Sequence, residues 1–115
     1  MQTHKPTLYI FAGLPGSGKT TLSQSLCQSI FAVYLRIDTI EQALRDLYSI
    51  NVQSEGYQLA YRLAADNLGL GKDVIADSCN PIEFTRQDWQ TVALQSGANF
   101  INIEVVCSDS KEHQR

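Results

Sequence analysis

The chain of 115 residues has few residues of the kinds that build disulfide or zinc sites. Its three cysteines, Cys27, Cys79 and Cys107, are far apart and odd in number, and they form no Cys-x-x-Cys pair. Neither a disulfide framework nor a zinc site is therefore indicated, and we interpret the cysteines as core thiols in a reducing compartment. The two histidines, His4 and His113, lie near the ends without the spacing of metal ligands.

No apolar run approaches the length that crosses a membrane, and residues 1–6 are too short and too polar for a signal peptide. We therefore expect a cytoplasmic protein. The net charge of −3 gives no general attraction for nucleic acid or an anionic membrane, although a local basic patch would still allow a nucleic-acid substrate. The length and the hydrophobic share of 43% predict one globular domain over residues 1–115.

One stretch carries a strong motif. Residues 13–20 read Gly-Leu-Pro-Gly-Ser-Gly-Lys-Thr, a complete match to the phosphate-binding loop pattern G-x-x-x-x-G-K-[ST]. An apolar run precedes the motif and an amphipathic run follows it, which is the strand–loop–helix context that such a loop requires. The alternative, a Gly/Pro-rich turn that happens to carry Lys-Thr, is less favoured because the spacing and both flanks are correct.

The chemistry of this loop assigns roles to its residues. Its glycines let successive backbone N–H groups turn inward and form an anion site, and the following helix adds the positive end of its dipole. We expect Lys19 to reach the β- and γ-phosphates of ATP and to act in catalysis, and the Thr20 hydroxyl to bind Mg²⁺. The predicted nucleotide-binding residues are Gly13, Pro15, Gly16, Ser17, Gly18, Lys19, Thr20 and Thr21.

Strands and helices alternate along the chain, which indicates a parallel sheet covered on both faces. The first helix should start near Lys19, end near Phe31 and carry Leu22, Leu26 and Ile30 on one face, as an amphipathic helix does. Asp38 and Glu41 have the spacing of a capping box at the start of the second helix. The predicted strands are Thr7–Ala12, Ala32–Ile37, Asp73–Ala76 and Asn99–Cys107, and the later helices are Thr39–Tyr48, Tyr57–Leu68 and Arg86–Ser96.

Two acidic residues follow predicted strands. Asp38 comes after the second strand and Asp77 after the third, and ligands bind beyond the carboxyl ends of the strands in such sheets. Asp38 is a candidate base for an acceptor hydroxyl, although capping the next helix would explain its position equally well. Asp77 is a candidate to support Mg²⁺, with a turn residue as the alternative.

Two arginines are candidate substrate contacts. Arg36 lies two residues before Asp38, so strand alternation would place both on one face, although a surface ion pair is equally compatible. Arg86 starts a helix that should face the same crevice, where a cation gains nothing from the helix dipole. This position supports an anion-binding role, although an ordinary surface arginine is equally compatible. Three aromatic residues at helical spacing fit the core better than a stacking platform: Tyr57, Tyr61 and Trp89.

Four stretches together resemble the small P-loop kinases and ATP-binding proteins often labelled AAA-type ATPases. This nucleoside-kinase-like group includes gluconate kinase, chloramphenicol phosphotransferase, the zeta toxins and the kinase domain of polynucleotide kinase. The stretches are GLPGSGKTTL (13–22), LRIDTIEQAL (35–44), GKDVIADSCNPIEFTRQDW (71–89) and IEVVCSDSKEHQR (103–115).

The resemblance implies a three-layer α/β P-loop NTPase fold, with a parallel sheet of order 2-3-1-4 and usually a fifth strand. It also implies ATP–Mg²⁺ as donor and transfer of the γ-phosphate to a hydroxyl. Asp38 matches the acceptor-side base, Asp77 the acid after the third strand, and Arg86 the arginine of the substrate-side helix.

The chain departs from this family at its end. In the family, the last stretch leads into a lid helix whose arginines clamp the phosphates, followed by a fifth strand and an adenine-contacting loop. Because the sequence stops at Arg115, we expect these parts to be missing, with Arg115 at most the first lid residue. The sequence is then a truncated piece of a longer protein, a degraded or mis-terminated protein, or a family member that completes its site with another copy, which makes a homo-oligomer an option.

Three functions follow from these observations. The leading one is an ATP–Mg²⁺-dependent kinase that phosphorylates a hydroxyl of a small molecule or nucleoside. The second is a polynucleotide 5′-hydroxyl kinase module, which would need a basic track to the acceptor site and is disfavoured by the acidic balance. The third is a non-catalytic nucleotide-binding fragment or a toxin-type kinase. No motif identifies the acceptor.

Overall fold

The computed structural model describes residues 5–13, 18–49, 54–78 and 83–105. Strands and helices alternate along these ranges as predicted. The strands are β1 (Thr7–Ala12), β2 (Val33–Arg36), β3 (Val74–Asp77) and β4 (Asn99–Glu104). The helices are α1 (Lys19–Ile30), α2 (Ile37–Tyr48), α3 (Glu55–Gly69) and α4 (Glu83–Gln95).

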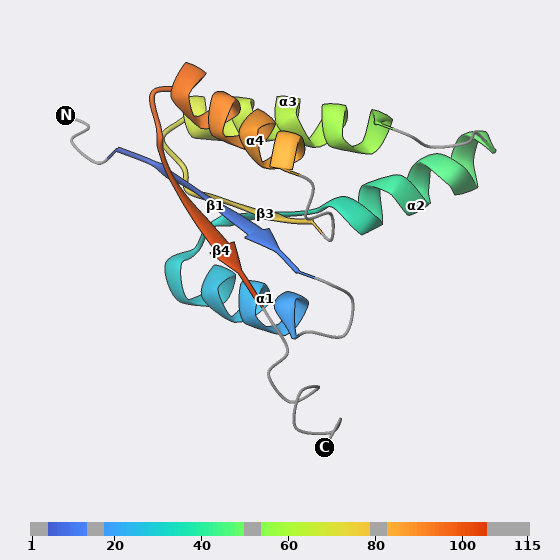
Figure 1. Cartoon of the computed structure of the whole chain (residues 1–115), viewed down its shortest axis with the longest axis horizontal. Helices are drawn as coiled ribbons and strands as arrows, with labels where there is room; N and C mark the ends of the chain where they lie inside the picture. The colour runs from blue at the N-terminus through green and yellow to red at the C-terminus, as the bar shows by residue number, and fades with distance from the viewer. Residues whose placement is uncertain (1–4, 14–17, 50–53, 79–82, 106–115) are drawn as a thin grey trace.

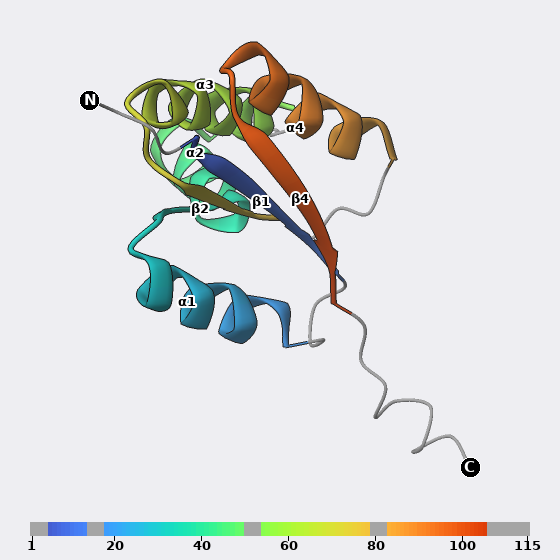
Figure 2. The same ribbon diagram turned by 90° about the vertical axis from the view of Figure 1, so that its left-hand side faces the viewer.

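The four strands form one parallel sheet in the order β2-β3-β1-β4, which confirms the predicted order and the three-layer α/β class. Helix α1 covers one face of the sheet, and helices α3 and α4 cover the other (Figures 1 and 2). Helix α2 continues beyond the carboxyl end of β2 and packs beside α3. The carboxyl ends of the four strands therefore lie at one edge of the sheet, next to the start of α1.

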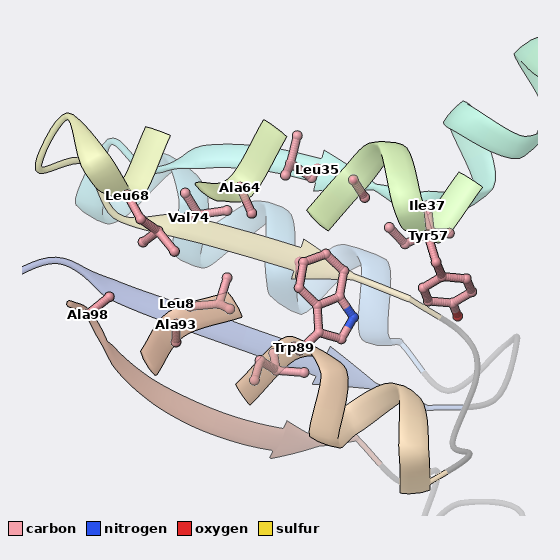
Figure 3. Close-up of a cluster of buried hydrophobic side chains, with 13 residues drawn as sticks. Leu8, Leu35, Ile37, Tyr57, Ala64, Leu68, Val74, Trp89, Ala93 and Ala98 are labelled. Atoms are coloured by element: carbon pink, nitrogen blue, oxygen red, sulfur yellow. The ribbon is translucent and has the colours of Figure 1, made fainter. Parts of the chain in front are cut away.

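The main hydrophobic core lies between the sheet and the helices α3 and α4 (Figure 3). Alternate strand residues such as Leu8 and Val74 point into it, and small residues of α3 such as Ala64 let the helix approach the sheet closely. Trp89 of α4 is 1% exposed, and its ring meets Tyr61 edge-on with the centroids 4.7 Å apart. Trp89 and the two tyrosines of α3 thus belong to the core, as expected.

Helix α1 packs in a different way from the prediction. Its buried residues are Lys19 and Ser23, whereas Leu22 of the predicted apolar face is 49% exposed. Leu26 and Ile30 are only half-buried. The inward side of α1 at the carboxyl edge of the sheet is therefore polar, because it faces Asp77 rather than apolar side chains.

The boundary between β2 and α2 also differs from the prediction. Strand β2 ends at Arg36 and the helix begins at Ile37, so Asp38 lies in the first turn of α2 instead of directly following a strand. The N-cap residue is Arg36 in an extended conformation, and it makes no side-chain capping hydrogen bond. The predicted capping box of Asp38 and Glu41 is therefore wrong. An acidic residue in the first turn still interacts favourably with the helix dipole.

Other boundaries shift by a few residues. Helix α3 begins at Glu55, before the predicted Tyr57, and β3 is displaced by one residue so that it ends at Asp77. The predicted end of the last strand, beyond Val105, lies outside the described residues. In the part of the chain that is described, no helix has both the length and the apolar character required to span a membrane.

Removing the largest core side chain should strongly destabilise the fold. We expect Trp89→Ala to lower the free energy of unfolding by about 3–5 kcal/mol, because a fully buried indole leaves a cavity. Chemical denaturation followed by circular dichroism measures the change. The matched control on the same helix is Leu94→Ala, at a side chain that is 67% exposed, which should change stability by at most about 0.5 kcal/mol. Equal losses in both variants would contradict this packing.

Candidate functional site

The described flanks of the phosphate-loop motif have the geometry that the motif predicts. Strand β1 ends at Ala12 and helix α1 begins at Lys19, with Gly18 as its N-cap at φ 88°. This left-handed conformation favours glycine, which explains the residue directly before the lysine. Four residues of the loop lie outside the described residues, including the predicted nucleotide contacts Pro15, Gly16 and Ser17.

Asp77 at the end of β3 is the centre of a buried polar cluster. Lys19 donates a hydrogen bond to Asp77 Oδ1 and forms an ion pair with it; Lys19 is 5% exposed and Asp77 is 1% exposed. The other carboxylate oxygen, Oδ2, accepts from the Tyr34 hydroxyl and lies 3.1 Å from Ser23 Oγ and 3.3 Å from Thr20 Oγ1. Residues from α1, β2 and β3 thus meet at one carboxylate.

This environment shifts two pKa values in opposite directions. Burial alone would raise the pKa of Asp77, but the hydrogen bonds from Lys19 and Tyr34 and the positive charge of Lys19 outweigh burial and lower it. Burial and the hydrogen bond to Asp77 raise the pKa of the Tyr34 hydroxyl to about 12. At neutral pH the cluster therefore contains an ionised carboxylate and a protonated tyrosine hydroxyl that donates a hydrogen bond to it.

Arg36 at the end of β2 and Asp38 in the first turn of α2 form a second, more exposed pair. Arg36 Nη2 lies 4.0 Å from Asp38 Oδ2, and the two side chains are 41% and 50% exposed, so the pair adds little stability. Strand alternation is not the reason for their proximity, since Asp38 belongs to α2. The two residues line a pocket of about 480 Å³ together with Thr39 and Gln42 of the same helix.

The pair lies close in the sheet to the buried cluster, because Arg36 of β2 is in register with Asp77 of β3. Arg36 Nε is buried, and no residue described by the structure accepts a hydrogen bond from it. Arg36 therefore retains an unused donor at the carboxyl edge of the sheet.

Arg86 occupies a different position. It is half-buried on α4 and lines a small pocket of about 130 Å³ with Ile10, Asn102 and Glu104. Ile10 points to the α3/α4 side of the sheet, whereas Asp77 points to the α1 side. The structure thus brings Lys19, Thr20 and Asp77 together and leaves Arg86 on the opposite face, where its predicted substrate contact stays a prediction.

A protein family described as an AAA domain matches residues 8–115. The chain belongs to this family. Its kinase-like P-loop fold, predicted from the four stretches above, is confirmed. A search of the curated proteins gave no match.

Several solved structures share the fold of this AAA domain. A protein of Chloroflexus aurantiacus provisionally described as a kinase has a TM-score of 0.79 and 24% identity over 91% of this chain and 62% of its own. A chain of the Pnkp1/Rnl/Hen1 complex has a TM-score of 0.74 and 20% identity over 100% and 40%. Chaetomium thermophilum Kti12 has a TM-score of 0.72 and 24% identity over 93% and 64%.

These identities are low enough that the likeness establishes the fold alone. The AAA domain spans 62% of the length of the first of these structures and 40% of the second. The kinase-like fold supports nucleotide binding in general terms, and the particular ligands have to be argued from the site itself.

The oxygen atoms of the buried cluster suit a magnesium ion. Thr20 Oγ1 and the carboxylate of Asp77 are hard oxygen donors, and Thr20 Oγ1 lies 3.3 Å from Asp77 Oδ2. Mg²⁺ in phosphate-transfer sites is held by one or two protein oxygens together with substrate phosphates, not by a dedicated cage of side chains. Consistent with this, the described part of the chain contains no group of three or more His, Cys, Asp or Glu residues placed to hold a metal.

Two members of the cluster, Ser23 and Tyr34, were missed by the sequence analysis. A signal for Ser23 was present, because it follows Lys19 by four residues and therefore shares its helix face. Tyr34 had no comparable signal, since its partner Asp77 is 43 residues away and the contact depends on the pairing of β2 with β3.

Removing the charge of Asp77 should destabilise the domain in a pH-dependent way. We expect Asp77→Asn to lower the free energy of unfolding at pH 7 by about 3 kcal/mol, because Lys19 loses its buried counter-charge. The pKa of Asp77 is lowered by folding, so its stabilising contribution exists above the ordinary value of 3.8 and disappears as the pH falls through the folded value. The difference in the free energy of unfolding between the wild type and Asp77→Asn should therefore disappear in acid.

Urea unfolding of both proteins between pH 7 and pH 2.5 measures this gap. Asp46→Asn is the control, since Asp46 is an exposed carboxylate on α2 whose change should shift stability by at most about 0.5 kcal/mol. A gap that stays constant down to the lowest pH would show that the carboxylate charge does not stabilise the fold.

Proposed function

We propose that this AAA domain binds ATP with Mg²⁺ and transfers the γ-phosphate to a hydroxyl group of a small molecule or nucleoside. The observation that carries the proposal is the buried pair of Lys19 and Asp77, which joins the phosphate-loop lysine to the acid at the end of β3. Kti12, a protein of the same fold, was solved in complex with ADP–AlF3, which supports a nucleotide site in this fold.

The start of α1 supplies donors for phosphate. The first intrahelical bond of this segment runs from Leu22 N to Gly18 O, at 3.0 Å. The N–H groups of Lys19, Thr20 and Thr21 precede it and have no partner within the helix, so they are available to an anion. Together with Gly13 and the central loop residues, these donors form the proposed nucleotide site.

Lys19 would exchange its partner when nucleotide binds. In the structure its ammonium is neutralised by a single carboxylate, whereas the β- and γ-phosphates carry more negative charge and more acceptor oxygens. Thr20 and Asp77 are the residues that would hold Mg²⁺. When bound, the ion would neutralise charge on the phosphates.

The acceptor would occupy the pocket beside α2. This open pocket is lined by Asp38 and Arg36, which supply a carboxylate and a cation for a polar acceptor. We infer that Asp38 takes the proton of the acceptor hydroxyl. At the same time, the acceptor oxygen bonds to the γ-phosphorus and the bond between that phosphorus and ADP breaks. The Arg36 side chain, which lines this pocket, would orient an acceptor oxygen. A substrate contact of Arg86 stays a prediction, because Arg86 lines a separate pocket on the other face of the sheet.

The lining of this pocket also bears on the polynucleotide alternative. A kinase for nucleic acid 5′ ends needs cations along the path of the phosphate backbone. The pocket contains two carboxylates, Asp38 and Asp46, and one cation, Arg36. A small acceptor is therefore favoured over a polynucleotide.

We also propose that residues 1–115 act as one domain, because β1 near the start of the chain pairs with β4 near its end. A cytoplasmic location and assembly with a second copy stay predictions.

Changing the proposed base should separate binding from transfer. We expect Asp38→Asn to reduce phosphoryl transfer about 10²- to 10⁴-fold, because the acceptor proton loses its base. Nucleotide affinity should stay within about twofold, since Asp38 is not part of the cluster around Lys19. Transfer from radiolabelled ATP to a panel of sugars, nucleosides, antibiotics and a 5′-hydroxyl oligonucleotide measures the activity, and calorimetry measures the affinity.

The matched control is Asp46→Asn, because Asp46 lines the same pocket from the same helix and has no proposed role in the reaction. An effect of equal size in both variants would contradict the role of Asp38. Phosphorylation of the oligonucleotide alone would favour the polynucleotide kinase. Nucleotide binding without transfer to any acceptor would favour a binding module.

A further inference from the structure

Tyr34 contributes to the buried cluster from outside the phosphate-loop motif. It lies on β2, the edge strand beside β3, and its hydroxyl donates to Asp77 Oδ2. The same hydroxyl lies 3.5 Å from Ser23 Oγ of α1. Tyr34 therefore connects the edge of the sheet to the acid at its centre and to the helix that carries Lys19.

The partners of Asp77 divide unequally between its two oxygens. Lys19 contacts Oδ1, whereas Tyr34, Ser23 and Thr20 are all placed at Oδ2. Lys19 is the charged partner, and it is the residue that nucleotide would attract away. The hydroxyl groups of Tyr34 and Ser23 are neutral, so a phosphate has no comparable charge attraction that would draw them away from Oδ2.

Burial makes these two anchors important. Asp77 is 1% exposed and Ser23 is 0% exposed, so bulk water has little access to replace a missing donor. Without a donor at Oδ2, the carboxylate would be free to rotate once Lys19 leaves Oδ1. A rotating carboxylate is a poor metal ligand, because ligand orientation depends on hydrogen bonds from the surrounding residues.

We propose that Tyr34 is a positioning residue that, with Ser23, holds Asp77 by its Oδ2 atom so that Oδ1 is available for the metal–nucleotide complex. This inference rests on the proposed nucleotide function and deepens it, because it assigns the metal dependence of the site to a residue on a different strand. Tyr34 touches neither the phosphates nor the acceptor in this scheme, and it acts through Asp77.

The variant Tyr34→Phe tests the proposal, because it removes the hydroxyl and keeps the ring. A fluorescent ATP analogue is titrated into the chain first with EDTA and then at a series of Mg²⁺ concentrations. We expect the affinity for the analogue in EDTA to stay within about twofold of the wild type. The Mg²⁺ concentration that gives half of the metal-induced increase in affinity should rise about 5- to 10-fold. Ser23→Ala should shift the metal dependence in the same direction.

Tyr9→Phe is the matched control. Tyr9 of β1 and Tyr34 of β2 are both in register with Ile75 of β3, so they lie in one row across the same face of the sheet. Both are half-buried, but Tyr9 is not a partner of Asp77. This control should lose a hydroxyl group without changing the Mg²⁺ dependence.

The outcomes distinguish this inference from the proposed function. A Tyr34→Phe variant that unfolds more easily but keeps the wild-type Mg²⁺ dependence would show a merely structural hydroxyl and overturn the inference alone. So would an equal loss of affinity with and without metal. If Tyr34→Phe does not fold, an unchanged metal dependence in Ser23→Ala overturns it. A wild-type chain that binds no nucleotide overturns both proposals.

Discussion

The ion pair between Lys19 and Asp77 is the interaction on which the site depends. Both residues are almost fully buried, and a buried pair of charges seldom adds net stability, because each ion loses its hydration. The surrounding hydroxyls of Thr20, Ser23 and Tyr34 compensate for part of that loss. The pair also explains why the inward side of α1 is polar at the carboxyl edge of the sheet, where an ordinary amphipathic helix would bury leucine.

The parallel sheet and the meeting of Lys19 with Asp77 could be predicted from the residues themselves, whereas the strand order was implied by the family resemblance. The alternation of apolar strands with helices requires a parallel sheet, and the phosphate-loop motif places its lysine at the start of the first helix. Because the carboxyl ends of parallel strands share one edge, an acid at the end of β3 is brought to the same place. The displacement of β3 by one residue did not affect this result, since Asp77 stays at the strand end.

Other features could not be predicted, for physical reasons that differ from residue to residue. Ile37 is β-branched and apolar, so it extends the apparent strand, yet it starts α2 and is 1% exposed in the core. Leu22, Leu26 and Ile30 form an apolar stripe, but the cluster at Asp77 determines which side of α1 faces the sheet. The contact between Tyr34 and Asp77 depends on strand pairing over 43 residues. The roles of Asp38 and Arg86 stay predictions.

The most direct test of the central claim is the affinity for a non-hydrolysable Mg²⁺–ATP analogue, measured by calorimetry on the wild type and Lys19→Ala. If the buried lysine exchanges Asp77 for phosphate, this variant should bind about 10- to 100-fold more weakly, because charge-assisted hydrogen bonds to the phosphates are lost. Lys72→Ala, at an exposed lysine in the turn before β3, should bind like the wild type. Equal affinity of Lys19→Ala and the wild type would contradict the claim.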